Sequence, residues 1–374
     1  MKTSVLLTLA VLASIIIYMP SELQEAVFGR VVWGPLRVEL IESIKRSPIY
    51  SEYRAPYTGY MPIIIDHGLP APPLYGLIWA FTSYLAYTVS RSPSTVMFTV
   101  VVYAIQAFLV LLFTVLTARL IRDIKMRVLV LITLAFCSMY SVEVLSALPL
   151  VLSLVYTRRG DYAKSLLYAG LATSISYFNF TLLVLLFFYT LREGYFNKKC
   201  GLMLLAGLAP YIALYIVKPE YYIILLDRVM YRDYTPLSLY RITSSIIGEE
   251  ISYRISIAVW LTILVVIVAL TPSTSDKLVN HVYSVLLALY TLHPYAYPQT
   301  LLLVLLPGFL ANRLQPERYY LVLELLNAAT IILYLRSLNP LSLDDPAQWA
   351  TQARNVVLLL GTLEALSALY KSEE

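Results

Sequence analysis

Apolar segments recur along almost the whole of this 374-residue chain, with short polar connections between them. Hydrophobic residues make up 59% of the sequence and charged residues 14%. Soluble domains have roughly 45–50% apolar and about 25% charged residues. Because a chain inside a bilayer must satisfy its backbone hydrogen bonds internally, consecutive apolar segments of this kind form helices. The sequence therefore predicts an all-α, multi-pass integral membrane protein.

Cysteine content and charge argue against several other classes of protein. Only two cysteines are present, Cys137 and Cys200, which are too few for a disulfide framework and lack the spacing of metal ligands. The net charge is +5, but Lys and Arg in a membrane protein are first of all indicators of topology. We therefore expect no metal site, no cofactor and no nucleic-acid partner.

The positions of the basic loops predict the topology. If every apolar segment crossed the membrane once, the basic loop 119–127 would share a side with the long polar stretch 28–73. That would contradict the tendency of short cytoplasmic loops to carry Lys and Arg. The conflict disappears if 72–89 is a re-entrant or interfacial helix in the outer leaflet. This assignment predicts about 11 transmembrane helices and puts the short basic loops in the cytoplasm. These loops are 119–127, 158–164, 192–199 and 312–318.

The domain organisation follows from this topology. We expect a single membrane domain over residues 1–374, without internal repeats. Residues 1–19 form an uncleaved first transmembrane helix, 20–94 an outer loop with interfacial helices, and 95–374 the remaining bundle. The expected location is the cell membrane in a prokaryote or the endoplasmic reticulum membrane in a eukaryote.

The outer loop after the first helix carries the most chemistry-bearing residues. Within 36–46, apolar side chains share one helical face and acidic ones the other, a pattern typical of an amphipathic helix on the membrane surface. Glu39 and Glu42 would face water one turn apart, and Asp66 follows after a turn-rich stretch. On the sequence alone, each of these carboxylates is interpreted as a solvated surface charge of the outer loop.

Several short motifs occur in this part of the chain: Arg30-Val31-Val32, Pro35-Leu36, Pro56-Tyr57-Thr58-Gly59, and His67 with Pro73-Leu74. These motifs resemble those of the polytopic glycosyltransferases of the GT-C superfold, and most of all those of the GPI-transamidase subunit PIG-U and its mannosyltransferase relatives. The resemblance extends more faintly to 177–186 and to His293-Pro294 with 301–307. It departs where Gly68, instead of an acid, follows His67, and where the mannosyltransferases have a D-x-D motif that this loop lacks.

The resemblance implies two alternative functions. As in PIG-U, the chain would be a non-catalytic subunit of a membrane transferase complex, and it would bind a lipid-linked glycan (GPI or GPI-like) for attachment to protein. Alternatively, it would be a GT-C glycosyltransferase that uses a polyprenyl-phosphate sugar donor and a divalent metal, with Glu39, Glu42 or Asp66 as base. The missing D-x-D motif favours the first function.

Residues for holding such a ligand are polar or aromatic groups on the predicted outer side. Arg228 and Arg232 lie one turn apart and are candidates for binding a phosphate, although Arg also anchors helices at the membrane interface. The 174–181 segment is either a tight turn between helices or the lining of a cavity. The full set of candidate substrate-binding residues is Tyr57, His67, Asn179, Arg228, Arg232 and His293.

Three ionisable residues lie inside predicted apolar helices. Glu324 and Glu364 are costly to place in a membrane, so each is a candidate functional residue. A charge near a helix end can also reach the interface, and this interpretation suits Glu364, which is close to Lys371. His281 is expected to be structural.

Overall fold

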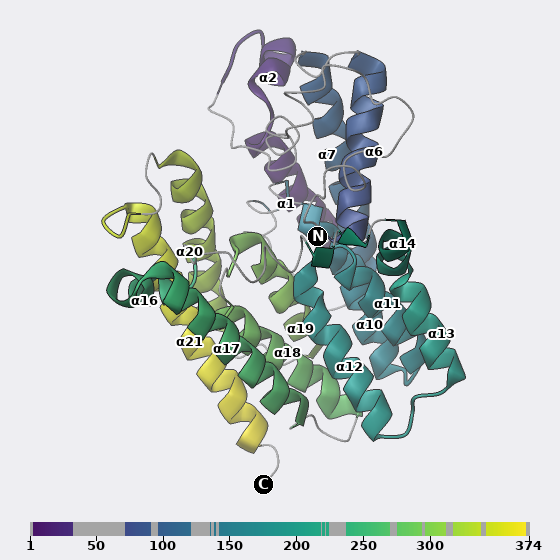
Figure 1. The fold of residues 1–374 in the computed structure, drawn as a ribbon. Helices are drawn as coiled ribbons and strands as arrows, with labels where there is room; N and C mark the ends of the chain where they lie inside the picture. Colours follow the sequence, from purple (N-terminus) through teal and green to yellow (C-terminus); the bar gives the residue numbers. More distant parts are fainter. Residues whose placement is uncertain are drawn as a thin grey trace.

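All regular secondary structure in the described part of the chain is helical, which confirms the all-α class (Figure 1). The structure is a computed structural model. It describes residues 3–32, 72–90, 96–120, 135, 138–139, 142–217, 219–220, 222–223, 237–269, 275–293, 296–311, 317–337 and 342–371.

The N-terminal part contributes helices α1 (Thr3–Ile17), α2 (Ser21–Phe28), α6 (Pro73–Ser90) and α7 (Val96–Leu120). The chain bends by 101° between α1 and α2, with Pro20 at the break, and α2 ends at Gly29 in a left-handed conformation. α1 and α6 both pack against α7 (Figure 1). The sequence predicts a helix over 72–89, and α6 matches it to within a residue at each end.

The central part is a set of short antiparallel helices that contains much of the core. Its turns have side-chain caps: Asp161 accepts from the Lys164 backbone N–H, and Asn197 accepts from that of Cys200. Its elements are η1 (Val142–Ser146), α10 (Ala147–Arg158), α11 (Tyr162–Thr173), η2 (Tyr177–Asn179), α12 (Phe180–Arg192), α13 (Lys198–Gly207) and α14 (Ala209–Val217).

The C-terminal part packs α18 against α19 and α21, and α20 along α21. Contacts of α10 with α18 and α19 join this part to the central helices, so that leucines of all three fill one core. Its elements are α16 (Tyr240–Ile247), α17 (Glu249–Ala269), α18 (Ser275–Thr291), η3 (Pro298–Thr300), α19 (Leu301–Ala311), α20 (Glu317–Arg336) and α21 (Pro346–Lys371).

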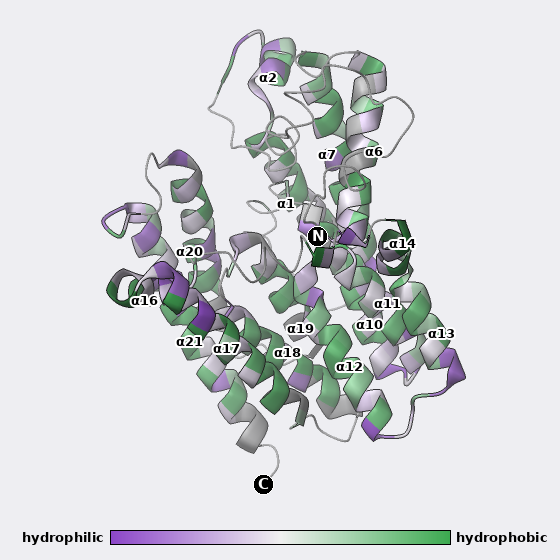
Figure 2. Ribbon diagram, viewed as in Figure 1, coloured by the Kyte–Doolittle hydropathy of each residue, from purple (hydrophilic) through white to green (hydrophobic). Residues whose placement is uncertain are grey.

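Apolar residues run along most of these helices, whereas polar residues gather near the helix ends and turns (Figure 2). By length and composition, Val96–Thr117 within α7 is the one described helix that could cross a membrane by itself. If each of two bent helix pairs, α1 with α2 and α13 with α14, is a single span, the number of possible membrane spans among the described helices rises to three. The described helices thus fit a membrane protein, and the larger number of spans stays a prediction.

Two helix boundaries differ from those expected. The apolar run 200–217 is two helices, α13 and α14, which meet at an angle of 58° after Gly207. The apolar run 355–370 predicts a helix over those residues, but α21 begins earlier, at Pro346, so that Arg354 lies within this helix. Proline at the first helical position is favourable because its missing N–H would have no partner there.

Candidate functional site

The structure describes two of the side chains proposed for the site, Asn179 and His293. Both lie in turns at the same end of the central helices, where Phe178 contacts His293. The other candidates lie outside the described residues, so their predicted roles stay predictions. They are Glu39, Glu42, Tyr57, Asp66, His67, Arg228 and Arg232.

Helix α6 begins directly against the end of α11. The backbone N–H groups of Leu74 and Tyr75 both donate to the Ser174 carbonyl, at 2.7 and 3.3 Å. The first N–H groups of a helix have no partner within it, and Pro73 has no N–H at all. The Ser174 carbonyl therefore satisfies the start of α6. Through this contact the Pro-Pro-Leu segment and the 174–179 turn, about a hundred residues apart, lie together.

The 174–179 turn is buried and internally hydrogen-bonded, as a tight turn requires. The Asn179 side-chain nitrogen donates to the Ala172 carbonyl at 3.1 Å, and the Tyr211 hydroxyl donates to the Thr173 carbonyl at 3.0 Å. Both acceptors belong to the last turn of α11, whose carbonyls lack partners within the helix. Asn179 is 1% exposed, and its amide group thus closes the end of α11.

Next to this turn lies a carboxylate that the sequence analysis does not select. Glu143 of η1 accepts a hydrogen bond from the Thr300 hydroxyl at 3.0 Å and a longer one from the Ser176 hydroxyl at 3.5 Å. These three residues form the Glu143 cluster. It joins η1, the α11–η2 turn and η3, and its carboxylate is only partly buried.

His293 follows α18 and contacts two aromatic rings edge-on. Its ring centroid lies 6.4 Å from that of Phe178 and 5.8 Å from that of Trp260. Trp260 is held in place because its indole N–H donates to the Leu289 carbonyl. Burial lowers the pKa of His293 from 6.5 to about 4. The imidazole is therefore neutral at pH 7, with one nitrogen that donates and one that accepts.

The backbone that follows His293 has a strained residue. Ala296 has a φ of 41°, which is uncommon for a residue with a Cβ atom. Its carbonyl accepts from the Arg354 guanidinium at 2.8 Å and from the Tyr290 hydroxyl at 3.2 Å. The Asn327 side-chain nitrogen donates to the Pro298 carbonyl at 3.0 Å. A strained conformation persists only where its surroundings hold it, and such positions concentrate at functional sites.

Arg354 is the centre of the network that holds this turn. The side chain is completely buried, and its guanidinium also donates to the Leu237 carbonyl at 2.8 Å and to the side-chain oxygens of Asn327 and Asn355. It thereby connects α21, α20, the residues before α16 and the turn before η3. The planar guanidinium has five N–H donors, which suits it to join several acceptors at once.

The sequence contains a signal for this network. Buried polar side chains of α21 recur at intervals of three, four and seven residues, on the side that faces the bundle. On an apolar helix, a polar stripe of this kind indicates a hydrogen-bonded interior. Its residues are Gln348, Thr351, Arg354, Asn355 and Thr362.

The three ionisable residues expected within apolar helices differ in burial. Glu324 is 1% exposed and lies one turn before Asn327 on α20, while His281 is 8% exposed on α18. Glu364 is exposed on α21. Glu324 thus stays a candidate functional residue, and the side chain of Glu364 needs no buried partner.

Taken together, one end of the helical bundle holds the partly buried Glu143 carboxylate, the two buried hydroxyl groups that donate to it, and a neutral imidazole beside aromatic rings. These groups donate and accept hydrogen bonds, and only Glu143 among them is charged. Among the described residues, no three His, Cys, Asp or Glu side chains lie close enough to bind a metal ion together. Comparison of the chain with protein-family models, with curated proteins and with solved structures finds no match in any of the three.

Proposed function

We propose that this protein holds a lipid-linked glycan, GPI or GPI-like, at the end of the bundle where the Glu143 cluster and His293 lie, and presents it for attachment to protein. In this proposal the chain is a GT-C-like bundle of about 11 transmembrane helices and a non-catalytic subunit of a membrane transferase complex. The site lies on the outer side of the membrane.

The observation that supports the proposal is the meeting of three segments. Part of the resemblance to PIG-U is carried by each of three segments: Pro73-Leu74 at the start of α6, residues 177–186, which include η2, and His293-Pro294 with 301–307. They are separated by about a hundred residues along the chain, yet hydrogen bonds and ring contacts join them at one place. Ligand sites of bundles are commonly built in this way from side chains of several helices.

The chemistry of the site suits a sugar. Sugar hydroxyls both donate and accept hydrogen bonds, so the Glu143 carboxylate, the Thr300 hydroxyl and the neutral His293 are matching partners. Helix α6 starts beside these groups and exposes apolar side chains along its length, a surface along which a lipid tail would lie. These exposed side chains are Leu77, Phe81, Tyr84, Leu85 and Val89.

The test is photo-crosslinking of the purified full chain with a photoactivatable, radiolabelled glycosylphosphatidylinositol. We expect labelled peptides that contain 174–179 and 296–300, and competition by unlabelled glycolipid but not by phosphatidylinositol. Thr300→Val, which removes the hydroxyl at nearly constant volume, should reduce labelling. Thr262→Val is the matched control, since the Thr262 hydroxyl donates to its own helix at an exposed position. Equal labelling of both variants would refute this site.

A partner provides a second test of the same proposal. A presenting subunit needs an enzyme that joins the glycan to protein, and a Cys-His hydrolase-like chain is the expected type. It should co-purify with the full-length protein from native membranes. Purification of the protein without such a chain, under conditions that keep other membrane complexes intact, would count against a role in a transferase complex.

One observation favours the alternative, a GT-C glycosyltransferase. Glu143 is a carboxylate in the same place, oriented by two hydroxyl donors, and a positioned carboxylate is what a general base requires. Purified protein would then transfer sugar from a dolichyl-phosphate donor to an acceptor hydroxyl. Loss of transfer in Glu143→Gln or Asp66→Asn, with glycolipid labelling retained, would establish the enzyme. If the wild-type protein transfers no sugar, the first proposal, a non-catalytic subunit that presents the glycan, is favoured.

A further inference from the structure

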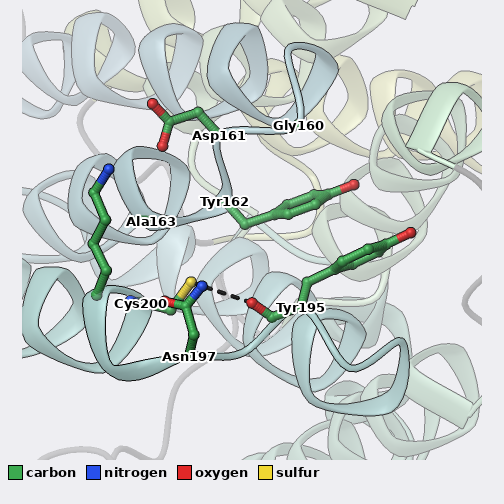
Figure 3. Close-up of a pocket in the computed structure, with 8 residues that line it drawn as sticks. Gly160, Asp161, Tyr162, Ala163, Tyr195, Asn197 and Cys200 are labelled. Carbon is green, nitrogen blue, oxygen red and sulfur yellow. Dashed lines mark hydrogen bonds between the residues drawn. The ribbon is translucent and has the colours of Figure 1, made fainter.

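A second candidate site lies at the opposite end of α11 from the Glu143 cluster. An open pocket of about 420 Å³ is formed where α11 and α13 begin, and Asp161, Tyr162, Tyr195 and Lys199 are among its lining residues (Figure 3). Because α11 (Tyr162–Thr173) has Asp161 as its N-cap and Ser174 as its C-cap, the pocket is separated from the Glu143 cluster by the length of this helix. The two sites are therefore distinct.

One wall of the pocket is aromatic. The rings of Tyr162 and Tyr195 are stacked, with centroids 4.8 Å apart and planes inclined by 18°, and Figure 3 shows them side by side. Tyr162 also hydrogen-bonds to Tyr189, which is 1% exposed behind it. Tyr195 is 45% exposed and presents its ring to the surface. Tyrosines in this position combine an apolar face with a polar tip, as at membrane interfaces.

The charge of the pocket is positive. Asp161 is compensated, because its carboxylate lies 2.8 Å from the Lys164 ammonium and also accepts from the Lys164 backbone N–H. The hydrogen bond from the Lys164 side chain lowers the pKa of Asp161, so this pair stays ionised. Lys199 also lines the pocket, and its charge contributes to the lowered pKa of Asp161, although no ion pair joins Lys199 to a described residue. An anionic group would therefore be attracted and a cation repelled.

We propose that this pocket binds the phosphate group of an anionic phospholipid. The Lys199 ammonium would contact the phosphate, and the stacked tyrosines would pack against the glycerol part of the headgroup. Basic pockets between transmembrane helices are binding sites for anionic headgroups on the cytoplasmic side. The basic loops 158–164 and 192–199, which form this pocket, are assigned to that side by the sequence. The proposal is independent of the function proposed above.

The experiment uses the purified full chain in phosphatidylcholine nanodiscs with increasing amounts of spin-labelled phosphatidylglycerol. Lys199→Gln should weaken selective binding of this lipid about fivefold, the effect of one lysine near a membrane surface. Lys198→Gln is the matched control, because Lys198 is exposed one residue earlier and does not line the pocket. Asp161→Asn should act in the opposite direction and strengthen binding, since it frees Lys164 and keeps a residue suited to cap α11.

A second arm separates a lipid headgroup from a free phosphate ester. Glycerol phosphate, added to the protein in neutral detergent, should not raise the melting temperature if the ligand is a lipid. A rise that Lys199→Gln abolishes would keep the phosphate site but overturn its assignment to lipid. Equal lipid binding by the Lys199 and Lys198 variants, with no gain in Asp161→Asn, would overturn the site itself. Because all three positions are at the surface, these variants are expected to fold.

Discussion

Gly170 of α11 and Gly207 of α13 pack backbone against backbone. A Cβ atom added to Gly170 would lie 2.8 Å from the Gly207 carbonyl carbon, and one added to Gly207 would lie 2.5 Å from the Leu167 carbonyl oxygen. Real Cβ atoms do not approach backbone this closely. Small residues allow such contact between helices in a membrane. The contact fixes α13 on the helix that carries Ser174 at one end and the phosphate pocket at the other.

Gly207→Ala should therefore destabilise the protein by about 1–3 kcal/mol, because the added methyl group meets backbone that cannot move aside. Gly201→Ala on the same helix is the control. Its Cβ would lie 3.8 Å from the nearest atom, in the Phe196 ring, and alanine favours a helix more than glycine does. Thermal unfolding in detergent should show a lower melting temperature for the first variant and an equal or higher one for the second. Equal behaviour of the two would mean that α11 and α13 are further apart.

Arg354→Met should be strongly destabilising even though Met is apolar and similar in length. The Leu237 and Ala296 carbonyls would lose a charged donor in a buried place, where each lost bond of this kind costs about 1.5–3 kcal/mol. Arg254→Met is the control, since Arg254 is exposed and its ion pair with Glu250 contributes less than about 1 kcal/mol. Hydrogen exchange should also become faster in 296–300 for the Arg354 variant. Unchanged exchange there would show that the turn keeps its conformation without Arg354.

Ala296→Val should destabilise the protein, whereas Ala296→Gly should have little effect. The positive φ of Ala296 disfavours a β-branched residue, and the side chain is 1% exposed, so the added methyl groups have no room. Glycine removes the backbone strain but also a buried methyl group, and the two effects are each about 1 kcal/mol. Melting temperatures of the two variants test this. A stable Ala296→Val protein would contradict the strained turn.

Much of the fold was predictable from the sequence because apolar runs and prolines determine local structure. The helix at α6 follows from the apolar run after Pro72 and Pro73, and α12 matches the run at 180–191. The break between α13 and α14 has a local signal, because Pro210 lacks the N–H that would continue a helix from α13, although the run 200–217 is otherwise apolar. The close packing of Gly207 on α11 was not predictable, because it is a contact between helices that no local pattern contains.

The candidate site was predictable only in part. His293 and Asn179 stand out as polar residues beside aromatic ones, but Glu143 lies in the gap between two apolar runs and resembles an ordinary turn residue. Its significance depends on Thr300, which is 157 residues further along the chain. Arg354 resembles a loop charge at the edge of an apolar run, and only the packing of α20 against α21 makes it a buried residue. Contacts of this kind arise from tertiary structure.

The low pKa of His293 predicts a specific sensitivity to acid. In the unfolded chain the imidazole would take up a proton near pH 6.5, whereas in the folded protein burial lowers its pKa to about 4. Between these values the unfolded state binds more protons, so the stability contributed by the neutral imidazole is fully present above pH 6.5 and decreases as the pH falls toward 4.

His293→Phe keeps a ring of similar size between Phe178 and Trp260 but does not titrate in this range. The variant and the wild-type protein should have similar melting temperatures at pH 7. As the pH falls from about 6.5 to about 4, the melting temperature of the wild type should decrease more steeply, because only the wild type has an imidazole whose pKa is lower in the folded than in the unfolded state. Carboxylates contribute an acid dependence of their own, but this is common to both proteins and cancels in the difference. If the melting temperatures of the two proteins change in parallel with pH, His293 is already charged or accessible to water in the folded state. In that case a neutral His293 cannot be the group that hydrogen-bonds to a glycan.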